Sequence, residues 1–351
     1  MEHEKRFQEL VDRAFTYEKE GRPDYYSKLS KRVQKIIERD TKYNVDFLYT
    51  AYELGDEKIM ENYALWLFRL MASVFHERRT LSETADYVIE HLEYICQAVR
   101  NTIEGEEQLH LLDLLEHAKS KVDEARDQDK ITEPIWKESR YEEQIGEYMG
   151  ALLKKDNRKA AYLIQQFAEE GIPTQDIYVE ILAESMRRVG ELWHTAKISV
   201  DQEHYCTSAT QMAMAQMYPN ILSSERKEKT MLCACPGTEL HEMGARMVAD
   251  IFENDGWDSI YLGAAVPEEY LLASIQENQP DLVVLSVALP PHLLTCRDLV
   301  VAIKKKFPDC KVAVGGNAFR LTEHLWSQWP IDIHTEDARE LLEWANREIE
   351  A

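Results

Sequence analysis

The sequence has no apolar run that could cross a lipid bilayer. A membrane-spanning helix needs roughly 20 apolar residues, whereas the longest runs here, such as Leu282 to Leu285, are far shorter. The N-terminal stretch MEHEKRFQEL is charged from its second residue, which argues against a signal peptide. These absences predict a cytoplasmic protein with no membrane partner.

The sequence also lacks the cysteine spacings of disulfide frameworks and zinc sites. Its 6 cysteines include no CxxC pair, so we expect reduced thiols in a reducing compartment. Cys233 and Cys235 are the one close pair. A zinc site needs about three or four ligands, and no second pair is present. We therefore interpret these two cysteines as positions on one face of a strand.

Positive charge is scarce. The 41 Lys and Arg residues face 64 Asp and Glu residues, and the formal net charge is -23. Proteins that bind nucleic acid generally need a basic patch that releases counterions from the phosphates. The charge balance therefore disfavours direct binding of nucleic acid.

The composition is that of an ordinary soluble protein, with 44% hydrophobic and 30% charged residues. A chain of 351 residues exceeds the usual size of a single core, so we expect two or three domains. Residues 1–130 have a helical pattern throughout, with Asp56 as a plausible N-cap. The charged stretch Lys119 to Pro134 predicts a linker and a domain boundary. The periodic residues of one helix are Met60, Tyr63, Leu67 and Met71, and a second helix is predicted over Leu81 to Val99.

Residues 138–224 predict an antiparallel four-helix bundle, because amphipathic segments follow one another with short loops between them. Gly171 and Pro173 separate the second and third segments, and Thr174 is a candidate N-cap of the third. The predicted helices are Tyr141 to Leu153, Arg158 to Glu169, Gln175 to Trp193 and Val200 to Leu222.

Residues 229–351 alternate short apolar strands with helices. Strands separated by helices of this length form a parallel, doubly wound sheet, because parallel neighbours need a crossover. The predicted fold class is therefore α plus α/β: an N-terminal all-helical domain, a four-helix bundle and a Rossmann-like or flavodoxin-like sheet. Such sheets bind ligands at the carboxyl ends of their strands.

Polar and small residues gather at those carboxyl ends. Glu239 and His241 follow the first strand, Ser286 ends the third, and Gly315 and Gly316 follow the fourth. An imidazole at this edge can reach a metal, and a carboxylate two residues earlier can hold its other ring nitrogen. The glycines let the backbone approach a bulky ligand.

This pattern resembles the cobalamin-binding family whose signature is DxHxxG, then a serine after a later strand, then two glycines. The resemblance covers about Tyr141 to Ala351. It implies that His241 is the lower axial ligand of cobalt and that the nucleotide tail enters the sheet beside the serine. Glu239 stands where the family has aspartate, and the segment after the serine departs from the family spacing. The implied cofactor-binding residues here are Glu239, Leu240, Gly244, Ser286, Val287, Ala288, Gly315 and Gly316.

A second segment, WHTAKISVDQEH, resembles the cap of CarH-type B12 photoreceptors. In that family tryptophan, valine, glutamate and histidine enclose an adenosyl group on the upper face of the corrin. His194 is then a possible upper cobalt ligand after photolysis, or alternatively a solvent-facing histidine at a helix end. His204 is expected to support Glu203 or the cofactor. The implied cap residues are Trp193, His194, Val200, Glu203 and His204.

These resemblances favour an adenosylcobalamin-binding light sensor rather than an enzyme. The sequence contains no MerR-type DNA-binding helix-turn-helix, so the N-terminal helical domain is expected to bind a protein partner or act as the output. The alternative is a corrinoid carrier for a methyltransferase, with methylcobalamin. An isomerase would need a barrel domain, which the helical N-terminus does not supply. The resemblance also implies a homo-oligomer, and the aromatic residues between 43 and 91 make a bilin pocket conceivable.

Overall fold

The computed structural model describes residues 2–128 and 130–349. It divides into a first unit, Met1–Glu133 with Leu321–Glu323, and a second unit, Pro134–Arg320 with His324–Ala351. Residues 1, 129, 350 and 351, which fall within the predicted domains, lie outside the described residues. Among the described residues, no helix combines the length and apolar character that a bilayer span requires.

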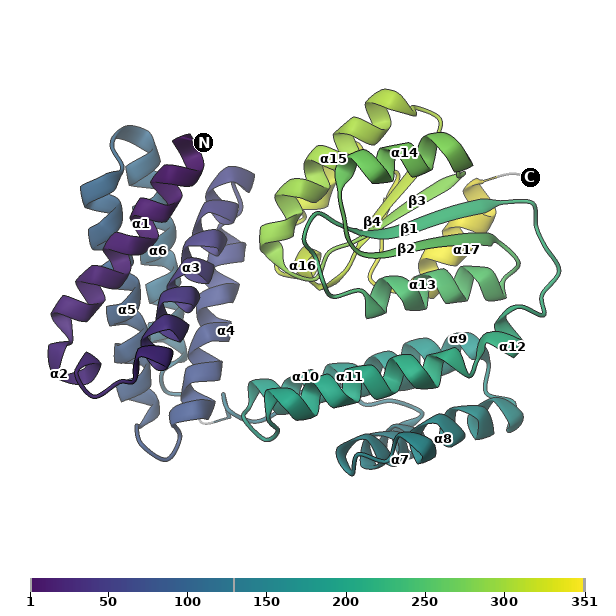
Figure 1. The fold of residues 1–351 in the computed structure, drawn as a ribbon, viewed down its shortest axis with the longest axis horizontal. Helices are drawn as coiled ribbons and strands as arrows, with labels where there is room; N and C mark the ends of the chain where they lie inside the picture. Colours follow the sequence, from purple (N-terminus) through teal and green to yellow (C-terminus); the bar gives the residue numbers. More distant parts are fainter. Residues whose placement is uncertain (1, 129, 350–351) are drawn as a thin grey trace. The chain divides into compact units, whose positions relative to one another are not determined.

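The first unit is helical (Figure 1). Asp56 caps the fourth helix, because its Oδ1 accepts a hydrogen bond of 3.0 Å from the backbone N–H of Lys58. Thr80 and Glu83 form a capping box at the start of the fifth. The helices are α1 (Glu2–Gly21), α2 (Pro23–Tyr26), α3 (Lys31–Leu54), α4 (Glu57–Phe75), α5 (Leu81–Thr102) and α6 (Gly105–Ala125).

The second unit begins with the four-helix bundle. Its helices are α7 (Glu142–Leu153), α8 (Asn157–Glu169), a continuous third helix and α11 (Val200–Ala215). The third helix consists of α9 (Thr174–Asp176), the π-helical segment η1 (Ile177–Leu182) and α10 (Ala183–His194). π-helical turns are frequent at functional sites, and this one faces the sheet domain, because its Tyr178 donates a hydrogen bond to Asp250.

Two details of the predicted bundle are wrong. Thr174 is the first residue of α9 rather than its N-cap, and Pro173 occupies the cap position without a side-chain hydrogen bond. The fourth helix ends at Ala215, and a separate short helix, α12 (Tyr218–Ile221), follows. Pro219 explains the break, because proline has no backbone N–H and its ring clashes with the preceding turn.

A five-stranded parallel sheet follows the bundle. Its strands are β1 (Thr230–Pro236), β2 (Asp258–Val266), β3 (Leu282–Ser286), β4 (Lys311–Gly315) and β5 (Ile333–His334). The strand order is β2-β1-β3-β4-β5, and every adjacent pair is parallel. The order reverses at β1 and β3, so the ligand crevice of such a sheet lies there. The Rossmann-like prediction is confirmed.

Helices cover both faces of this sheet (Figure 1). α14 (Glu268–Asn278) and α15 (Leu293–Lys306) cover one face, and α13 (Met243–Asn254) and α17 (Ala338–Glu348) cover the other. The bundle packs on the α13 and α17 side, where one continuous buried core contains residues of the bundle, of both helices and of the strands. Short helical segments complete the domain: η2 (Pro290–His292), α16 (Asn317–Arg320) and η3 (Leu325–Gln328).

Candidate cofactor site

The turn between β1 and α13 is organised around one buried carboxylate. Glu239 is 0% exposed, and its side chain accepts four hydrogen bonds. Oε1 accepts from the backbone N–H of His241 at 2.9 Å and lies 2.7 Å from Nδ1 of His241. Oε2 accepts from the backbone N–H groups of Ala288 and Leu289, both at 2.9 Å. The carboxylate therefore joins the loop after β1 to the loop after β3.

These contacts set the ionisation of Glu239 and the tautomer of His241. Burial opposes the ionisation of Glu239, but the hydrogen bonds from His241, Leu289 and Ala288 outweigh it and lower the pKa of Glu239 to about 2. The hydrogen bond to Glu239 raises the pKa of His241. An ionised carboxylate can only accept, so Nδ1 of His241 carries the proton. Nε2 is then the ring atom with a free electron pair when the imidazole is neutral.

His241 presents that ring to the outside of the sheet edge. Its side chain is 60% exposed, and no hydrogen bond from the described residues 2–128 and 130–349 reaches Nε2. The charge of Glu203, on bundle helix α11, also raises the pKa of His241. The imidazole therefore lies within electrostatic reach of the bundle.

Glu242, the next residue, ties the same turn to its surroundings. Its Oε2 accepts hydrogen bonds of 3.1 Å from the hydroxyl of Tyr261 and from the backbone N–H of Ala264, both on β2. Its Oε1 accepts a hydrogen bond of 3.3 Å from Nε2 of Gln211 on α11. The loop that carries the imidazole is thus held by the sheet on one side and by the bundle on the other.

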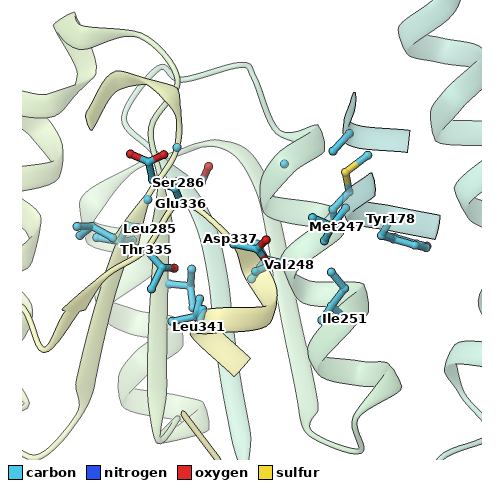
Figure 2. Close-up of a pocket in the computed structure, with 18 of the residues that line it drawn as sticks. Tyr178, Met247, Val248, Ile251, Leu285, Ser286, Thr335, Glu336, Asp337 and Leu341 are labelled. Atoms are coloured by element: carbon cyan, nitrogen blue, oxygen red, sulfur yellow. The ribbon is translucent and has the colours of Figure 1, made fainter. Parts of the chain in front are cut away.

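A cavity of about 200 Å³ opens beside this turn, between α13, the ends of β3 and β4, and the third bundle helix. Four of the predicted site residues line it: Gly244, Ser286, Gly315 and Gly316. In Figure 2, Ser286 and Thr335 lie on one side of the cavity, and Met247 and Ile251 lie on the other. Most of the remaining lining is apolar, which suits a flat aromatic ring.

Gly316 and Gly244 differ in the space around them. Gly316 has φ +105, and a Cβ there would lie 2.3 Å from the carbonyl oxygen of Val287, so a side chain cannot be accommodated. At Gly244 a Cβ would meet nothing within 4 Å. The space beside Gly244 is open, so a ligand in the cavity can approach the backbone there. This unfilled space and the free Nε2 of His241 fit a corrinoid with a detached tail.

The predicted cap residues form a second group, at the junction of α10 and α11. Trp193 and His194 end α10 and stack at 6.4 Å between ring centroids. Val200 is the first residue of α11 and is 53% exposed. Oε2 of Glu203 lies 2.6 Å from Nδ1 of His204, and Oε1 accepts a hydrogen bond of 2.9 Å from Thr207. None of these cap residues lines the cavity beside Gly244.

His194 and the remaining predicted residues differ in exposure. His194 is 4% exposed, which contradicts the alternative interpretation of a solvent-facing histidine. Leu240 is 72% exposed at the tip of the turn. Val287 and Ala288 contribute their backbone to the loop after β3: Val287 meets Gly316, and Ala288 donates to Glu239.

Comparisons with known proteins agree with this geometry. A B12 binding domain model matches residues 229–342, and a second B12 binding domain model matches residues 145–218. The chain carries a B12 binding domain. The first match covers the sheet, and the second runs from within α7 to the first residue of α12.

Relatives of the two matched segments include corrinoid proteins and a transcriptional repressor. A corrinoid protein of Desulfitobacterium hafniense (strain Y51) is 24% identical over 211 residues, 58% of this chain and 96% of the relative. The HTH-type transcriptional repressor CarH of Myxococcus xanthus is 28% identical over 151 residues, 42% of this chain and 50% of CarH. The structure of the monomethylamine corrinoid protein of Methanosarcina barkeri has a TM-score of 0.52 at 20% identity and covers 60% of this chain and 100% of that protein. At that identity the likeness shows the fold alone.

The sequence missed several residues of the B12 binding domain's cavity. Tyr178 and Arg187 reach it from the bundle, and Thr335 and Asp337 reach it from the segment after β5. No pattern pointed to β5, because it spans only Ile333–His334 and lacks an apolar run. The position of Tyr178 depends on the π-helical turn, which a regular 3.6-residue period does not predict.

Proposed function

We propose that this chain is a light sensor that binds adenosylcobalamin between its bundle and its sheet, with His241 as the lower axial ligand of cobalt. The observation that carries the cobalamin-binding part of the proposal is the state of His241: Nδ1 is held by the buried carboxylate of Glu239, and Nε2 is left to face a metal. A carboxylate of this kind fixes the tautomer and raises the basicity of a ligating histidine.

The two groups of site residues support a cofactor held at two places. Gly244, Ser286, Gly315 and Gly316 line the cavity that would receive the tail. On the bundle, Trp193, Val200, Glu203 and His204 are proposed to enclose the upper ligand. Val200 is small and exposed at the start of α11, so it leaves room that a bulky apolar side chain would fill. The carboxylate of Glu203 can accept hydrogen bonds from a ribose.

When bound, adenosylcobalamin supplies a cobalt–carbon bond that visible light can break. The protein's part is to orient the cofactor through His241, to exclude water with Trp193, and to place His194 next to the upper side as a possible replacement ligand. A ligand exchange there would move the junction of α10 and α11. That junction is continuous with the bundle helices, so a change in bundle packing or in oligomeric state is the proposed output.

A second candidate is a corrinoid carrier for a methyltransferase. It is favoured by the match along 96% of the Desulfitobacterium corrinoid protein, whereas the match covers 50% of CarH. In this alternative the same His241 and the same cavity hold methylcobalamin, and the chain passes a methyl group to a separate enzyme.

Illumination of the loaded protein distinguishes the two candidates. The chain is loaded in the dark with adenosylcobalamin or, as the matched control, with methylcobalamin, and absorption spectra and size-exclusion elution are recorded before and after green light. The sensor predicts tight adenosylcobalamin binding, a light-induced spectral change and a shift in elution. A light-stable spectrum with unchanged elution, or a clear preference for methylcobalamin, would favour the carrier.

The bilin pocket between residues 43 and 91 stays a prediction. In the first unit Phe47 stacks on Tyr63 at 3.9 Å between ring centroids, and Tyr63 is buried. These two rings pack against each other, as aromatic side chains in the core of a helical domain commonly do. Reconstitution with biliverdin and a search for far-red absorption would test the pocket directly.

A further inference from the structure

The first unit carries a basic helix face in an acidic protein. Between residues 28 and 42 the sequence has 6 basic and 2 acidic side chains, while the whole chain has a net charge of -23. Lys31, Lys35 and Lys42 are exposed on α3 and make no ion pair within the part of the chain that the structure describes. Their spacing places them, with Arg39, along one stripe of the helix. We call Lys31, Lys35, Arg39 and Lys42 the basic stripe.

These positive charges destabilise α3 in the absence of a partner. The first turn of α3 contains no acidic residue, and Lys31 and Arg32 stand where the helix dipole favours negative charge. Lys31, Lys35 and Arg39 also repeat like charges at four-residue spacing, which is destabilising on a helix surface. An anionic partner on this face would relieve both effects.

An apolar side chain accompanies the cations. Ile36 is 39% exposed, and it lines a shallow surface hollow together with Lys31, Arg32, Lys35 and Arg39. A face that combines cations with an exposed aliphatic group fits an acidic helix that carries an apolar residue of its own.

The first unit contains such a helix face. Residues 104–116 include 5 acidic and no lysine or arginine side chains. Glu106, Leu109 and Asp113 share one stripe of α6, and Leu109 is 66% exposed. Glu106 and Asp113 are exposed and make no ion pair among the described residues. We call Glu106, Leu109 and Asp113 the acidic stripe.

The two stripes match in length as well as in charge. Glu106 and Asp113 are seven residues apart, as are Lys35 and Lys42, which places each pair about 10 Å apart along its helix. Two antiparallel helices can therefore form both ion pairs at once, with Leu109 between them. We propose that the basic stripe of α3 binds the acidic stripe of α6 in a second copy of this chain (Figure 1 locates both helices). This self-association depends on the first unit and does not rest on cobalamin binding.

Paired charge reversals test the contact. One variant carries Lys35→Glu and Lys42→Glu, and the other carries Glu106→Lys and Asp113→Lys. A control with Lys19→Glu and Lys305→Glu has the same net charge as the first variant but leaves both stripes intact. All are studied as the full chain, before any corrinoid is added, by sedimentation velocity at about 0.05 M and about 0.5 M salt. Circular dichroism verifies that each variant is folded.

The wild type and the control are expected to self-associate at low salt and to dissociate at high salt. Each stripe variant alone should bind itself at least about tenfold more weakly. A mixture of the two stripe variants should form a complex, because the basic stripe of one meets the acidic stripe of the other. A monomeric wild type at low salt, unchanged association of either variant, or no complex in the mixture would overturn the proposal.

Discussion

The hydroxyl of Tyr178, in the π-helical segment of the bundle, donates a hydrogen bond of 2.9 Å to Oδ2 of Asp250 on α13. The hydroxyl of Tyr218 donates to Oδ1 of the same carboxylate at 3.0 Å. Asp250 is 5% exposed, and burial raises the pKa of Asp250 despite these two donors. Tyr178 also lines the cavity beside Gly244. One buried carboxylate thus holds the bundle against the helix that forms a wall of the proposed tail site.

Replacing Tyr178 with phenylalanine should destabilise the second unit. The buried carboxylate of Asp250 would lose one of its donors, and a hydrogen bond to a charged group contributes about 1.5–3 kcal/mol. Urea unfolding should therefore show a lower free energy for Tyr178→Phe. The matched control is Tyr162→Phe, because Tyr162 is 62% exposed on α8. Equal free energies of unfolding for the two variants would contradict this account.

Replacing Glu239 with glutamine should weaken corrinoid binding by about 10–100-fold, the usual effect of losing a partner of a ligating histidine. Each carboxylate oxygen of Glu239 accepts from two N–H donors. Glutamine has only one acceptor oxygen, so its NH₂ group would point at one of these pairs of donors and leave that pair without an acceptor. Titration followed by absorption measures the affinity and the histidine-ligated spectrum. Glu340→Gln removes the same charge from the exposed face of α17 and should leave both unchanged.

Alanine substitutions at Gly316 and Gly244 should have opposite effects on the free energy of unfolding. Gly316→Ala should lower the free energy of unfolding by at least about 2 kcal/mol, because of its φ of +105 and the approach to Val287. Gly244→Ala, within α13, should raise it by about 0.5–1 kcal/mol, since alanine is the better helix former. The same methyl group would enter the cavity, so corrinoid affinity should fall. Gly244→Ala with unchanged affinity would remove this residue from the proposed site.

Acid should weaken the hydrogen bonds that connect Asp332 to β4 and to Lys304. Its side chain accepts hydrogen bonds from Lys304, from Lys311 at 3.2 Å and from the backbone N–H of Val312 at 2.8 Å. Burial opposes ionisation, but these donors lower the pKa of Asp332 below 3.8. The stabilisation is therefore complete above pH 3.8 and is lost as the pH falls through the lower, folded-state value. Chemical unfolding should show Asp332→Asn less stable than the wild type at pH 7, and the difference should shrink below pH 4.

Short-range patterns were sufficient for most of the fold. Asp56 and the apolar period after it predicted the start of α4, and the apolar runs around Met231 and Leu282 predicted two strands of the sheet. The same reasoning placed Ser286 and Gly316 at one edge, because parallel strands bring their carboxyl ends together. The structure adds that both of these residues line one cavity.

Contacts that depend on tertiary geometry could not be predicted. The sequence suggested that Glu239 holds His241, but nothing in it indicated that Oε2 of Glu239 binds the backbone of Ala288 and Leu289, about fifty residues away. Thr174 was predicted as a cap from residue type alone, whereas the chain begins its helix one residue earlier than that prediction required. The bundle's contribution to the cavity through Tyr178 follows from a π-helical turn that no residue pattern announces.

The four donors around Glu239 also bear on the rate and the entropy of cofactor capture. Since one anion fastens two loops that belong to different strands, the imidazole already points in a fixed direction in the free protein. Binding of the cofactor would then cost less conformational entropy, because the side chain of His241 and its loop are already ordered. Variants at Glu239 should accordingly bind the corrinoid more slowly as well as more weakly. Loss of a direct contact with the ligand would instead mainly increase the dissociation rate.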